Sequence, residues 1–316
     1  MEKILITGAS GQLGVVLTKA LQKKYGIQNV IASDISISDN YDGVFEILDA
    51  TNFDAVNYCI SKNKITQVYH LVAILSAKGE SNPLNTWNIN MNTLFNVFES
   101  SRLNGVKKVF YPSSIAVFGE DIEYINTPQF PNLTPLTVYG MSKAAGENWA
   151  NYYYKKYGLD IRSVRYPGVI GYQSLPGGGT TDYAVSIYHN AVKNERFDCF
   201  LEPSTTLPMI FMEDAIRATL ELMAAPKENI KVRTSYNLSG MSFSPMQIYE
   251  SIKKINPDFK ITYTPDFRQE IANSWPKSID DSQAREDWGW QPKYNLDTMS
   301  AEMMKNLKKY YNLVSV

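Results

Sequence analysis

Residues 6–14 read ITGASGQLG, a short apolar run that leads into glycines at positions 8, 11 and 14. Glycines at this spacing, between a strand and a helix, allow a tight turn and let the backbone approach a pyrophosphate at a helix N-terminus. A glycine turn without a ligand is the alternative, because a glycine triplet alone is weak evidence. The flanking apolar run and the helical pattern from Gln12 to about Tyr25 favour a dinucleotide site.

The first half of the chain alternates between short apolar runs and helical patterns. Such alternation is typical of parallel βαβ units, with helices on both faces of a sheet. We therefore predict an α/β fold, a Rossmann-type doubly wound parallel sheet with a ligand crevice at the carboxyl ends of its strands. The expected strands lie within residues 3–9, 29–34, 43–49, 67–73, 107–114 and 160–171, and further helices cover residues 52–63, 83–104 and 139–157.

After residue 171 the alternation weakens, which predicts a smaller C-terminal substrate-binding lobe. We expect residues 1–170 to form the dinucleotide-binding domain, completed by residues 206–240. The smaller lobe then comprises residues 171–205 and 241–316. In this second half the patterns predict helices over 181–194, 213–225, 244–255 and 296–311 and a strand over 260–266.

The composition excludes several classes of function. The net charge is −1, and no basic stripe predicts nucleic acid or an anionic membrane as the main partner. The start MEKILITG does not read as a signal peptide, and no apolar run is long enough to span a bilayer. We expect Cys59 and Cys199 to be thiols of a cytoplasmic protein. Two histidines, His70 and His189, without a His/Cys cluster predict no metal site.

Two acidic residues end expected strands near the glycine turn. Asp34 ends the second strand, where a carboxylate can accept hydrogen bonds from both ribose hydroxyls and would repel a 2′-phosphate. NAD is therefore favoured over NADP. Asp49 ends the third strand and could meet the adenine, although an N-cap of the helix that follows is nearly as good an interpretation.

Tyr139 and Lys143 are the candidate catalytic pair. At spacing i, i+4 on a helix their side chains share one face. A phenol is a poor base at neutral pH, and an adjacent ammonium favours the phenolate and lowers the pKa of the tyrosine. Ser113 and Ser114 lie at the carboxyl end of the preceding strand, where a serine can hold a substrate hydroxyl beside the phenol. An ordinary exposed Tyr–Lys pair is the alternative.

Together, the glycines, the strand-end Asp34, PSSIAVFG and Tyr-x-x-x-Lys resemble the extended short-chain dehydrogenase/reductase family, whose members include nucleotide-sugar epimerases. The late segment WGWQPKYNLD is similar to that family's C-terminal Gly-Trp-x-Pro segment. The resemblance implies Tyr139 as general base, Lys143 as its modulator and Ser114, rather than Ser113, as the residue that orients the hydroxyl. The expected NAD-binding residues are Gly8, Gly11, Gln12, Leu13, Gly14, Asp34, Asp49, Leu71, Ala73, Asn90, Tyr139, Lys143 and Tyr166.

One family motif is absent. Epimerases that resemble this chain carry Arg-Asp-x-x-x-Val ahead of a helix, and the arginine neutralises the diphosphate of the sugar nucleotide. The corresponding stretch is TLPMIFMEDAIRA, in which Leu207 and Pro208 replace the arginine and the aspartate. This apolar strand reads as core, so a sugar-nucleotide substrate is disfavoured.

The stretch PGGGTTDYAV, residues 176–185, follows the strand that should pass the nicotinamide. Its glycines 177–179 expose backbone N–H groups ahead of a helix that begins near Thr181 or Asp182, and Thr180 and Thr181 add hydroxyls. A helix N-terminus binds a carboxylate well, and Asp182 can hold an ammonium group. These groups fit a small amino acid, and plain helix capping is the alternative.

This loop, and the segment ANSWPKSIDDSQAREDWGW, resemble the short-chain type L-threonine 3-dehydrogenases. The resemblance implies oxidation of the 3-hydroxyl of L-threonine, a homodimer formed through the helices at 83–104 and 139–157, and no metal. The expected substrate-binding residues are Ser76, Ser114, Tyr139, Thr180, Thr181, Asp182 and Trp275. The alternatives are a nucleotide-sugar epimerase or dehydratase that anchors its diphosphate through Lys193 or Arg196, and a non-catalytic NAD-binding regulator.

Overall fold

The computed structural model describes residues 2–37, 41–177 and 179–313. Its central sheet has six parallel strands in the order β3-β2-β1-β4-β5-β7. This order reverses between β1 and β4, as it does in doubly wound dinucleotide-binding folds, and the predicted Rossmann-type fold is confirmed. The strands are β1 (Ile4–Thr7), β2 (Val30–Asp34), β3 (Val44–Ile47), β4 (Gln67–His70), β5 (Lys108–Phe110) and β7 (Asp160–Arg162).

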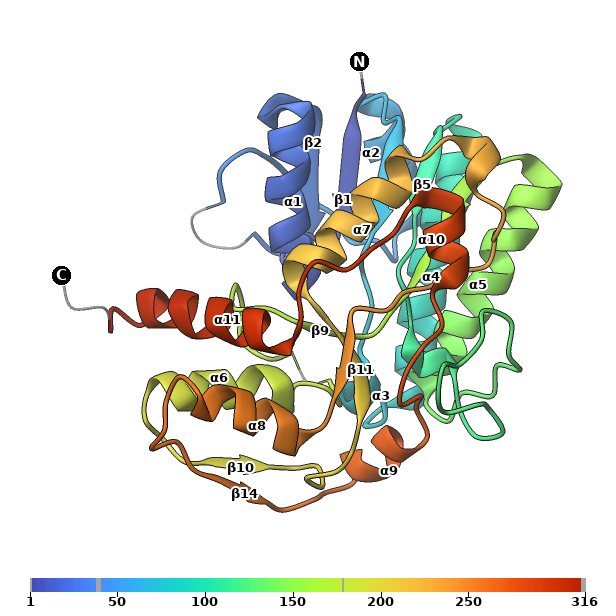
Figure 1. Ribbon diagram of the computed structural model, residues 1–316. Coiled ribbons are helices and arrows are strands. Elements are labelled where there is room, and N and C mark those ends of the chain that lie inside the picture. The colour runs from blue at the N-terminus through green and yellow to red at the C-terminus, as the bar shows by residue number, and fades with distance from the viewer. Residues whose placement is uncertain (1, 38–40, 178, 314–316) are drawn as a thin grey trace.

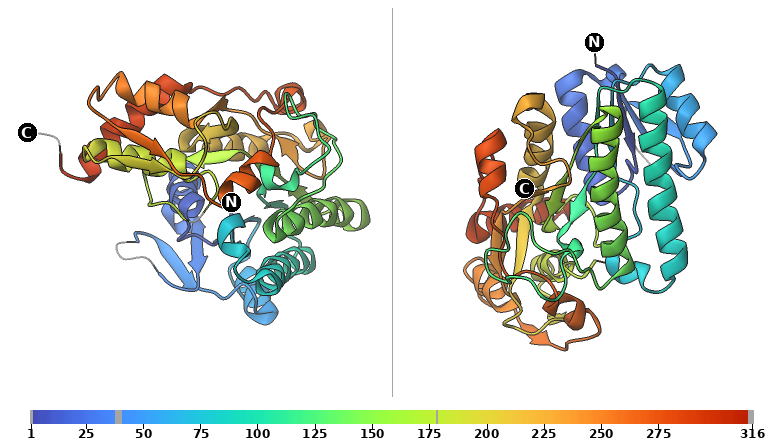
Figure 2. Two further views of the ribbon diagram at one scale, coloured as in Figure 1. Left: turned by 90° about the horizontal axis from the view of Figure 1, so that it is seen from below. Right: turned by 90° about the vertical axis from the view of Figure 1, so that its right-hand side faces the viewer.

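Helices cover both faces of this sheet (Figures 1 and 2). In β1, Ile4 and Ile6 pack in one apolar cluster with α1 and α7, whereas Leu5 packs in another with α2, α4 and α5. The alternation follows from the strand geometry, because successive side chains point to opposite faces. The helices are α1 (Gln12–Tyr25), α2 (Phe53–Lys62), α4 (Pro83–Leu103), α5 (Val138–Tyr157) and α7 (Met212–Ala224).

Polar side chains fix where the long helices begin. The Asn82 side chain accepts a hydrogen bond from the Asn85 N–H, and Pro83 occupies the first turn of α4. The Thr137 hydroxyl accepts from the Gly140 N–H at the start of α5. Each cap satisfies an N–H group that has no partner within its own helix. The predicted helices at 83–104 and 139–157 agree with the structure to within about a residue at each end.

A smaller lobe lies at the carboxyl end of the sheet, at the bottom of Figure 1. Its apolar core joins α6, α8 and α11 with Cys199, Leu207 and Trp275. The sheets β12-β8-β6 and β13-β11-β9 connect it to the rest of the molecule, whereas the sheet β10-β14 lies within the lobe. The elements are β6 (Ser113–Ser114), β8 (Val164–Tyr166), β9 (Gly168–Ile170), α6 (Tyr183–Val192), β10 (Phe197–Cys199), β11 (Leu207–Phe211), β12 (Tyr236–Asn237), β13 (Met241–Phe243), α8 (Pro245–Lys253), β14 (Ile261–Tyr263) and α11 (Leu296–Tyr310).

Several short elements were not predicted from the sequence. They include the helices α3 (Ser76–Gly79), α9 (Arg268–Asn273) and α10 (Ser282–Trp288), and the one-turn 3-10 helices at Ile27–Asn29, Ile115–Val117 and Lys227–Asn229. Trp290, which follows α10, is fully buried in the same cluster as Leu17 of α1 and Ala215 of α7. This part of the expected smaller lobe therefore packs on the dinucleotide-binding half.

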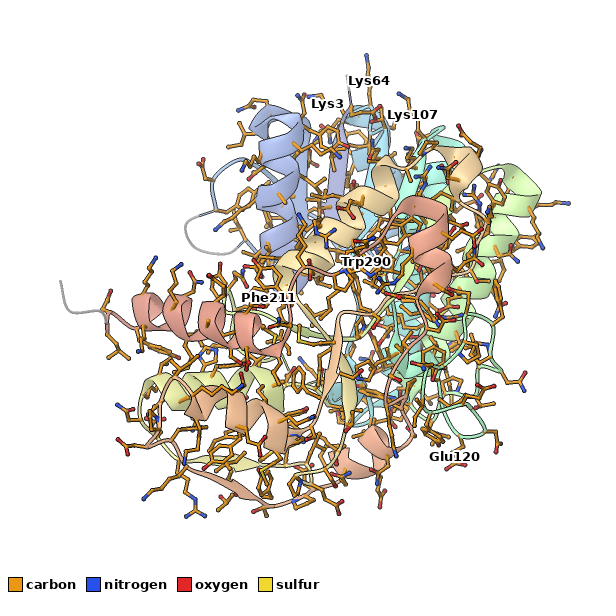
Figure 3. All side chains as sticks on the ribbon, in the orientation of Figure 1. Lys3, Lys64, Lys107, Glu120, Phe211 and Trp290 are labelled. Carbon is orange, nitrogen blue, oxygen red and sulfur yellow. The ribbon has the colours of Figure 1, made fainter. Side chains whose placement is uncertain are left out.

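The two ends of the sheet differ in character. Figure 3 shows Lys3, Lys64 and Lys107 gathered at the end where the strands begin, far from the smaller lobe. The opposite end, where β1 and β4 finish, opens into a cavity. Within the described ranges, no helix has the length and apolar character needed to cross a membrane.

Candidate active site

The cavity has a volume of about 240 Å³ and lies between the central sheet and the smaller lobe. It is situated at the reversal of strand order, where doubly wound sheets bind their ligands. Most of the residues predicted for cofactor and substrate line this cavity, although they come from distant segments of the chain. They are Gly8, Gly11, Gln12, Leu13, Gly14, Leu71, Ala73, Ser76, Ser114, Tyr139, Lys143, Tyr166, Thr180, Thr181, Asp182 and Trp275.

The glycine turn fits a dinucleotide. Gly8 has φ +80°, a conformation that side chains disfavour, and its N–H donates to the Ser33 carbonyl. A Cβ on Gly14 would lie 2.3 Å from the Gly8 carbonyl oxygen, so only glycine lets α1 start this close to β1. The first N–H groups of α1 therefore border the cavity without side chains in front of them, as a pyrophosphate requires.

The predicted ribose and adenine contacts lie beyond this cavity. Asp34 ends β2, and its carboxylate accepts from the N–H groups of Ser10, at 3.0 Å, and Ile35, at 2.8 Å. Its position beside the glycine turn suits a ribose hydroxyl acceptor. Asp49 is exposed and accepts from the N–H and hydroxyl of Thr51. Asp49 is not the N-cap of α2, because that position belongs to Asn52, so this alternative interpretation is wrong.

Asn90 is placed differently from the other predicted cofactor residues. Its side chain is buried in α4, accepts from the Ile74 N–H at 2.8 Å and donates to the Ser142 hydroxyl at 3.1 Å. It therefore links the segment after β4 to α5 and does not line the cavity. In this structure Asn90 positions Ala73 and its neighbours, which do line it.

Tyr139 and Lys143 both face the cavity from α5. The Lys143 ammonium lies 5.6 Å from the centre of the Tyr139 ring and donates to the Pro112 carbonyl at 2.7 Å. Burial raises the pKa of Tyr139 to about 12, opposed by a hydrogen bond with Ser114. Burial also lowers the pKa of Lys143 to about 7. The expected lowering of the tyrosine pKa is therefore wrong for the chain alone, because burial disfavours the charged forms of both Tyr139 and Lys143.

The structure separates the two candidate serines. Ser114 lines the cavity, accepts from the Ala116 N–H at 3.2 Å and hydrogen-bonds to Tyr139. The Ser113 hydroxyl is buried and donates to Glu147 at 2.6 Å. Of the two serines, Ser114 is therefore the one that borders the cavity beside the phenol.

The glycine–threonine loop meets the segment after β4 across the cavity. The hydroxyls of Ser76 and Thr180 lie 3.4 Å apart, although the two residues are 104 positions apart in sequence. Asp182 precedes α6, and its carboxylate accepts from the Gly179 N–H at 2.8 Å. Of the glycine run, Gly178 lies outside the described residues. Hydroxyls, backbone N–H groups and one carboxylate thus face the Tyr139 side of the cavity.

Trp275 follows α9 and closes the cavity on the side of the smaller lobe. It is 5% exposed and packs in the core of that lobe while also lining the cavity. Trp275 therefore belongs both to the core of the smaller lobe and to the wall of the cavity.

The sequence analysis did not single out the apolar part of the wall. Leu75 precedes α3, Ile115 follows Ser114, and Pro167 to Val169 follow Tyr166. Each directly adjoins a predicted site residue at a strand end, which is the signal that could have identified it. Leu207 and Pro208 are buried in β11, as the core reading predicted. No arginine is found among the described residues that line the cavity.

Comparisons with known proteins agree with this geometry. Residues 4–239 match the model of the NAD dependent epimerase/dehydratase family. An uncharacterised epimerase/dehydratase of Staphylococcus aureus (strain MRSA252) is 43% identical, over 98% of each chain. The holo structure of a GalE-like L-threonine dehydrogenase from Cupriavidus necator is 51% identical with a TM-score of 0.95, covering 97% of this chain and 100% of that one.

A monomeric L-threonine 3-dehydrogenase from a metagenome, solved in its apo form, is 48% identical with a TM-score of 0.95, over 97% of this chain and 99% of that one. The family match spans most of the chain, and its glycine turn and Tyr139–Lys143 pair border one cavity. This chain therefore belongs to the NAD dependent epimerase/dehydratase family.

Proposed function

We propose that this protein is an NAD-dependent L-threonine 3-dehydrogenase, which oxidises the 3-hydroxyl of L-threonine to give 2-amino-3-oxobutanoate. The observation that carries the proposal is the meeting of Ser76 and Thr180 across the cavity that also holds Tyr139. The resemblance to threonine dehydrogenases implies that both hydroxyls contact the substrate, and solved enzymes of that name are 48% and 51% identical to this chain.

NAD fits the residues present. Gly8, Gly11 and Gly14 leave backbone N–H groups open for the pyrophosphate, and Asp34 supplies a ribose acceptor. The cavity is also lined by Leu71, Ala73 and Tyr166. When bound, NAD supplies the hydride acceptor and a positive charge near Tyr139.

The chain's own residues handle the proton. Ser114 holds the substrate hydroxyl against Tyr139, whose phenolic oxygen takes the proton. The charged form of Lys143 stabilises the phenolate, because an adjacent positive charge opposes the effect of burial. No negative charge develops on the substrate oxygen if proton and hydride leave together, so this cavity needs no additional cation.

Thr180, Thr181 and Asp182 suit the amino acid end of the substrate. The hydroxyls and the N–H groups before α6 can donate to a carboxylate, and the Asp182 carboxylate can accept from an ammonium group. Trp275 and Leu75 close the cavity around the small apolar part of the molecule. The cavity wall thus offers complementary partners to each group of threonine.

The decisive experiment follows the absorbance of reduced cofactor with purified protein and NAD. We expect a rise with L-threonine and much less with L-allo-threonine or L-serine, which differ in the configuration at Cβ or lack the methyl group. A UDP-hexose tested in parallel, with product analysis by chromatography, distinguishes the epimerase alternative. Conversion of the UDP-hexose without oxidation of threonine would overturn the proposal.

We also propose that the protein forms a homodimer and that it is located in the cytoplasm. α4 and α5 expose Leu84, Trp87, Met141, Trp149 and Tyr152, an apolar surface that suits a homodimer. Free buried thiols at Cys59 and Cys199 suit the cytoplasm. Because one threonine dehydrogenase of this fold is named monomeric, light scattering of the purified protein is the test, and a monomer at micromolar concentration would contradict the homodimer.

A further inference from the structure

Three consecutive residues, Pro112 to Ser114, are bound to one face of α5. The Pro112 carbonyl accepts from the Lys143 ammonium at 2.7 Å. The Ser113 hydroxyl donates to Glu147 at 2.6 Å, and Ser114 hydrogen-bonds to Tyr139. Residues 139, 143 and 147 follow each other at intervals of one helical turn, so their side chains share a face.

The contact between Ser113 and Glu147 is buried and strong. Glu147 is 1% exposed, and Arg165 of β8 binds both of its carboxylate oxygens, Nε to Oε1 at 2.9 Å and Nη2 to Oε2 at 2.8 Å. Ser113 and Arg165 are paired in register on neighbouring strands. A bidentate, buried ion pair holds its partners in one geometry. Ser113 is therefore attached to both α5 and β8 through a single carboxylate.

Arg165 also binds groups outside α5. Its Nη1 donates to the Gln129 carbonyl at 2.8 Å and to the Asn237 side chain at 3.0 Å. The charge of Glu147 is therefore balanced and its orientation fixed by groups outside α5. The position of the carboxylate is set by the scaffold and does not depend on substrate.

The helix approaches this strand unusually closely. A Cβ on Gly140 would lie 2.0 Å from the Ala116 carbonyl oxygen, and one on Gly146 would lie 2.3 Å from the Tyr111 hydroxyl. At this spacing a small shift of Ser113 moves both Pro112 and Ser114 relative to α5. Along the chain, Ser113 lies between Pro112 and Ser114, the residues that hydrogen-bond to Lys143 and Tyr139.

We propose that Glu147, acting through Ser113, is a positioning residue that holds Ser114 and Pro112 in register with Tyr139 and Lys143. The inference rests on the proposed dehydrogenase function and deepens it. Because the Ser114 bond favours the phenolate, loosening Ser113 weakens that bond. The ionisation of Tyr139 then requires a higher pH.

The test is Ser113→Ala, which removes the contact and leaves the Glu147–Arg165 ion pair in place. We expect kcat with L-threonine to fall about tenfold, in line with the loss of one hydrogen bond, while KM for NAD stays unchanged. The acid limb of the pH profile of kcat should move upward by about half a pH unit. Ser113→Thr, which keeps the hydroxyl, should restore both values.

Ser163→Ala is the matched control. Ser163 is equally buried, and its hydroxyl bonds to the Ser235 hydroxyl at 2.9 Å without contacting α5. This variant loses one buried hydrogen bond and should keep the wild-type kcat and pH profile. An unchanged profile in Ser113→Ala, or the same shift in Ser163→Ala, would overturn the positioning role.

The pH readout depends on few neighbouring groups. Besides Lys143, the ionisable side chains around the phenol are Tyr111, whose pKa burial raises, and Asp182 across the cavity. Farther along, His70 contacts Thr7 and stays neutral, because burial lowers its pKa to about 3. None of these residues contacts the Ser113 hydroxyl, so the substitution leaves their charges in place.

A second measurement tests the positioning role of Glu147 and Ser113 independently of the proposed dehydrogenase activity. Near-ultraviolet titration of the phenolate, with NAD present and the corresponding Tyr139→Phe protein as reference, needs no threonine. If wild-type protein oxidises no threonine, the proposed function fails, whereas an upward shift of the titration in Ser113→Ala still supports the positioning role. Absence of that shift, with normal turnover of threonine, overturns the positioning role alone.

Discussion

The cofactor side and the substrate side of the cavity are built in opposite ways. On the cofactor side, Gly8, Gly11 and Gly14 lie within one short stretch between β1 and α1, although Gly8 also contacts the distant Ser33 and Leu71. On the substrate side, Ser76 and Thr180 are 104 positions apart and meet only in the folded chain. The difference teaches that the glycine motif of the dinucleotide site is contained in one stretch of sequence, whereas the substrate site is a property of the assembled lobes.

The largest effect is expected for Tyr139→Phe, which changes a group placed between the cofactor side and the substrate side of the cavity. We expect kcat to fall by about a thousandfold or more, because a positioned general base contributes on that scale. NAD binding, measured by calorimetry, should stay within about twofold, since the phenyl ring keeps its place in the wall. Activity that survives in this variant would show that the phenol is not the base.

Gly14→Ala tests the cofactor side alone. The added Cβ would lie 2.3 Å from the Gly8 carbonyl oxygen, so the start of α1 must shift. We expect NAD affinity to fall by about a hundredfold, which corresponds to about 2.7 kcal/mol. Gly177→Ala is the control, because its Cβ would meet only Leu75 at 3.7 Å. Equal losses of NAD affinity in the two variants would contradict the local nature of the site.

Thr180→Ala tests the substrate side. The substitution removes a buried hydroxyl near Ser76, and the loss of one hydrogen bond predicts about a tenfold rise in KM for L-threonine. The dissociation constant of NAD should not change. A variant that lost affinity for NAD as strongly as for threonine would show that the two sides are not independent.

Asp34→Ala gives the most selective effect. It removes the acceptor at the end of β2, so we expect affinity for NAD to fall about tenfold and discrimination against NADP to relax. KM for threonine should stay the same. Steady-state rates with both cofactors measure the effect, and an unchanged preference would show that Asp34 does not contact the ribose.

The sequence analysis predicted the helices and strands that local sequence patterns determine. The helices at 83–104 and 139–157 were predicted from their helical patterns, and the structure begins them after the N-caps Asn82 and Thr137. The parallel sheet followed from alternating runs. α3 and β12 were missed, because elements of only four and two residues carry no periodicity and form through tertiary contacts.

The candidate site was predictable in position but not in detail. The Ser113–Glu147 contact joins residues 34 positions apart, so no spacing rule indicates it. The effect of Lys143 on Tyr139 was misjudged, because sequence shows which charges are neighbours on a helix and not how deeply the fold buries them. Asn90 was expected at the cofactor, although its side chain instead fixes the segment around Ile74.

The burial of Trp290 has a consequence for biosynthesis. This side chain completes the apolar cluster that also contains Leu17 and Ala215. During translation the cofactor-binding motifs emerge from the ribosome first, yet the apolar cluster formed with α1 and α7 lacks Trp290 until the last part of the chain follows. We expect a nascent chain that ends before Trp290 to depend on chaperones, and NAD binding to appear only after synthesis is nearly complete.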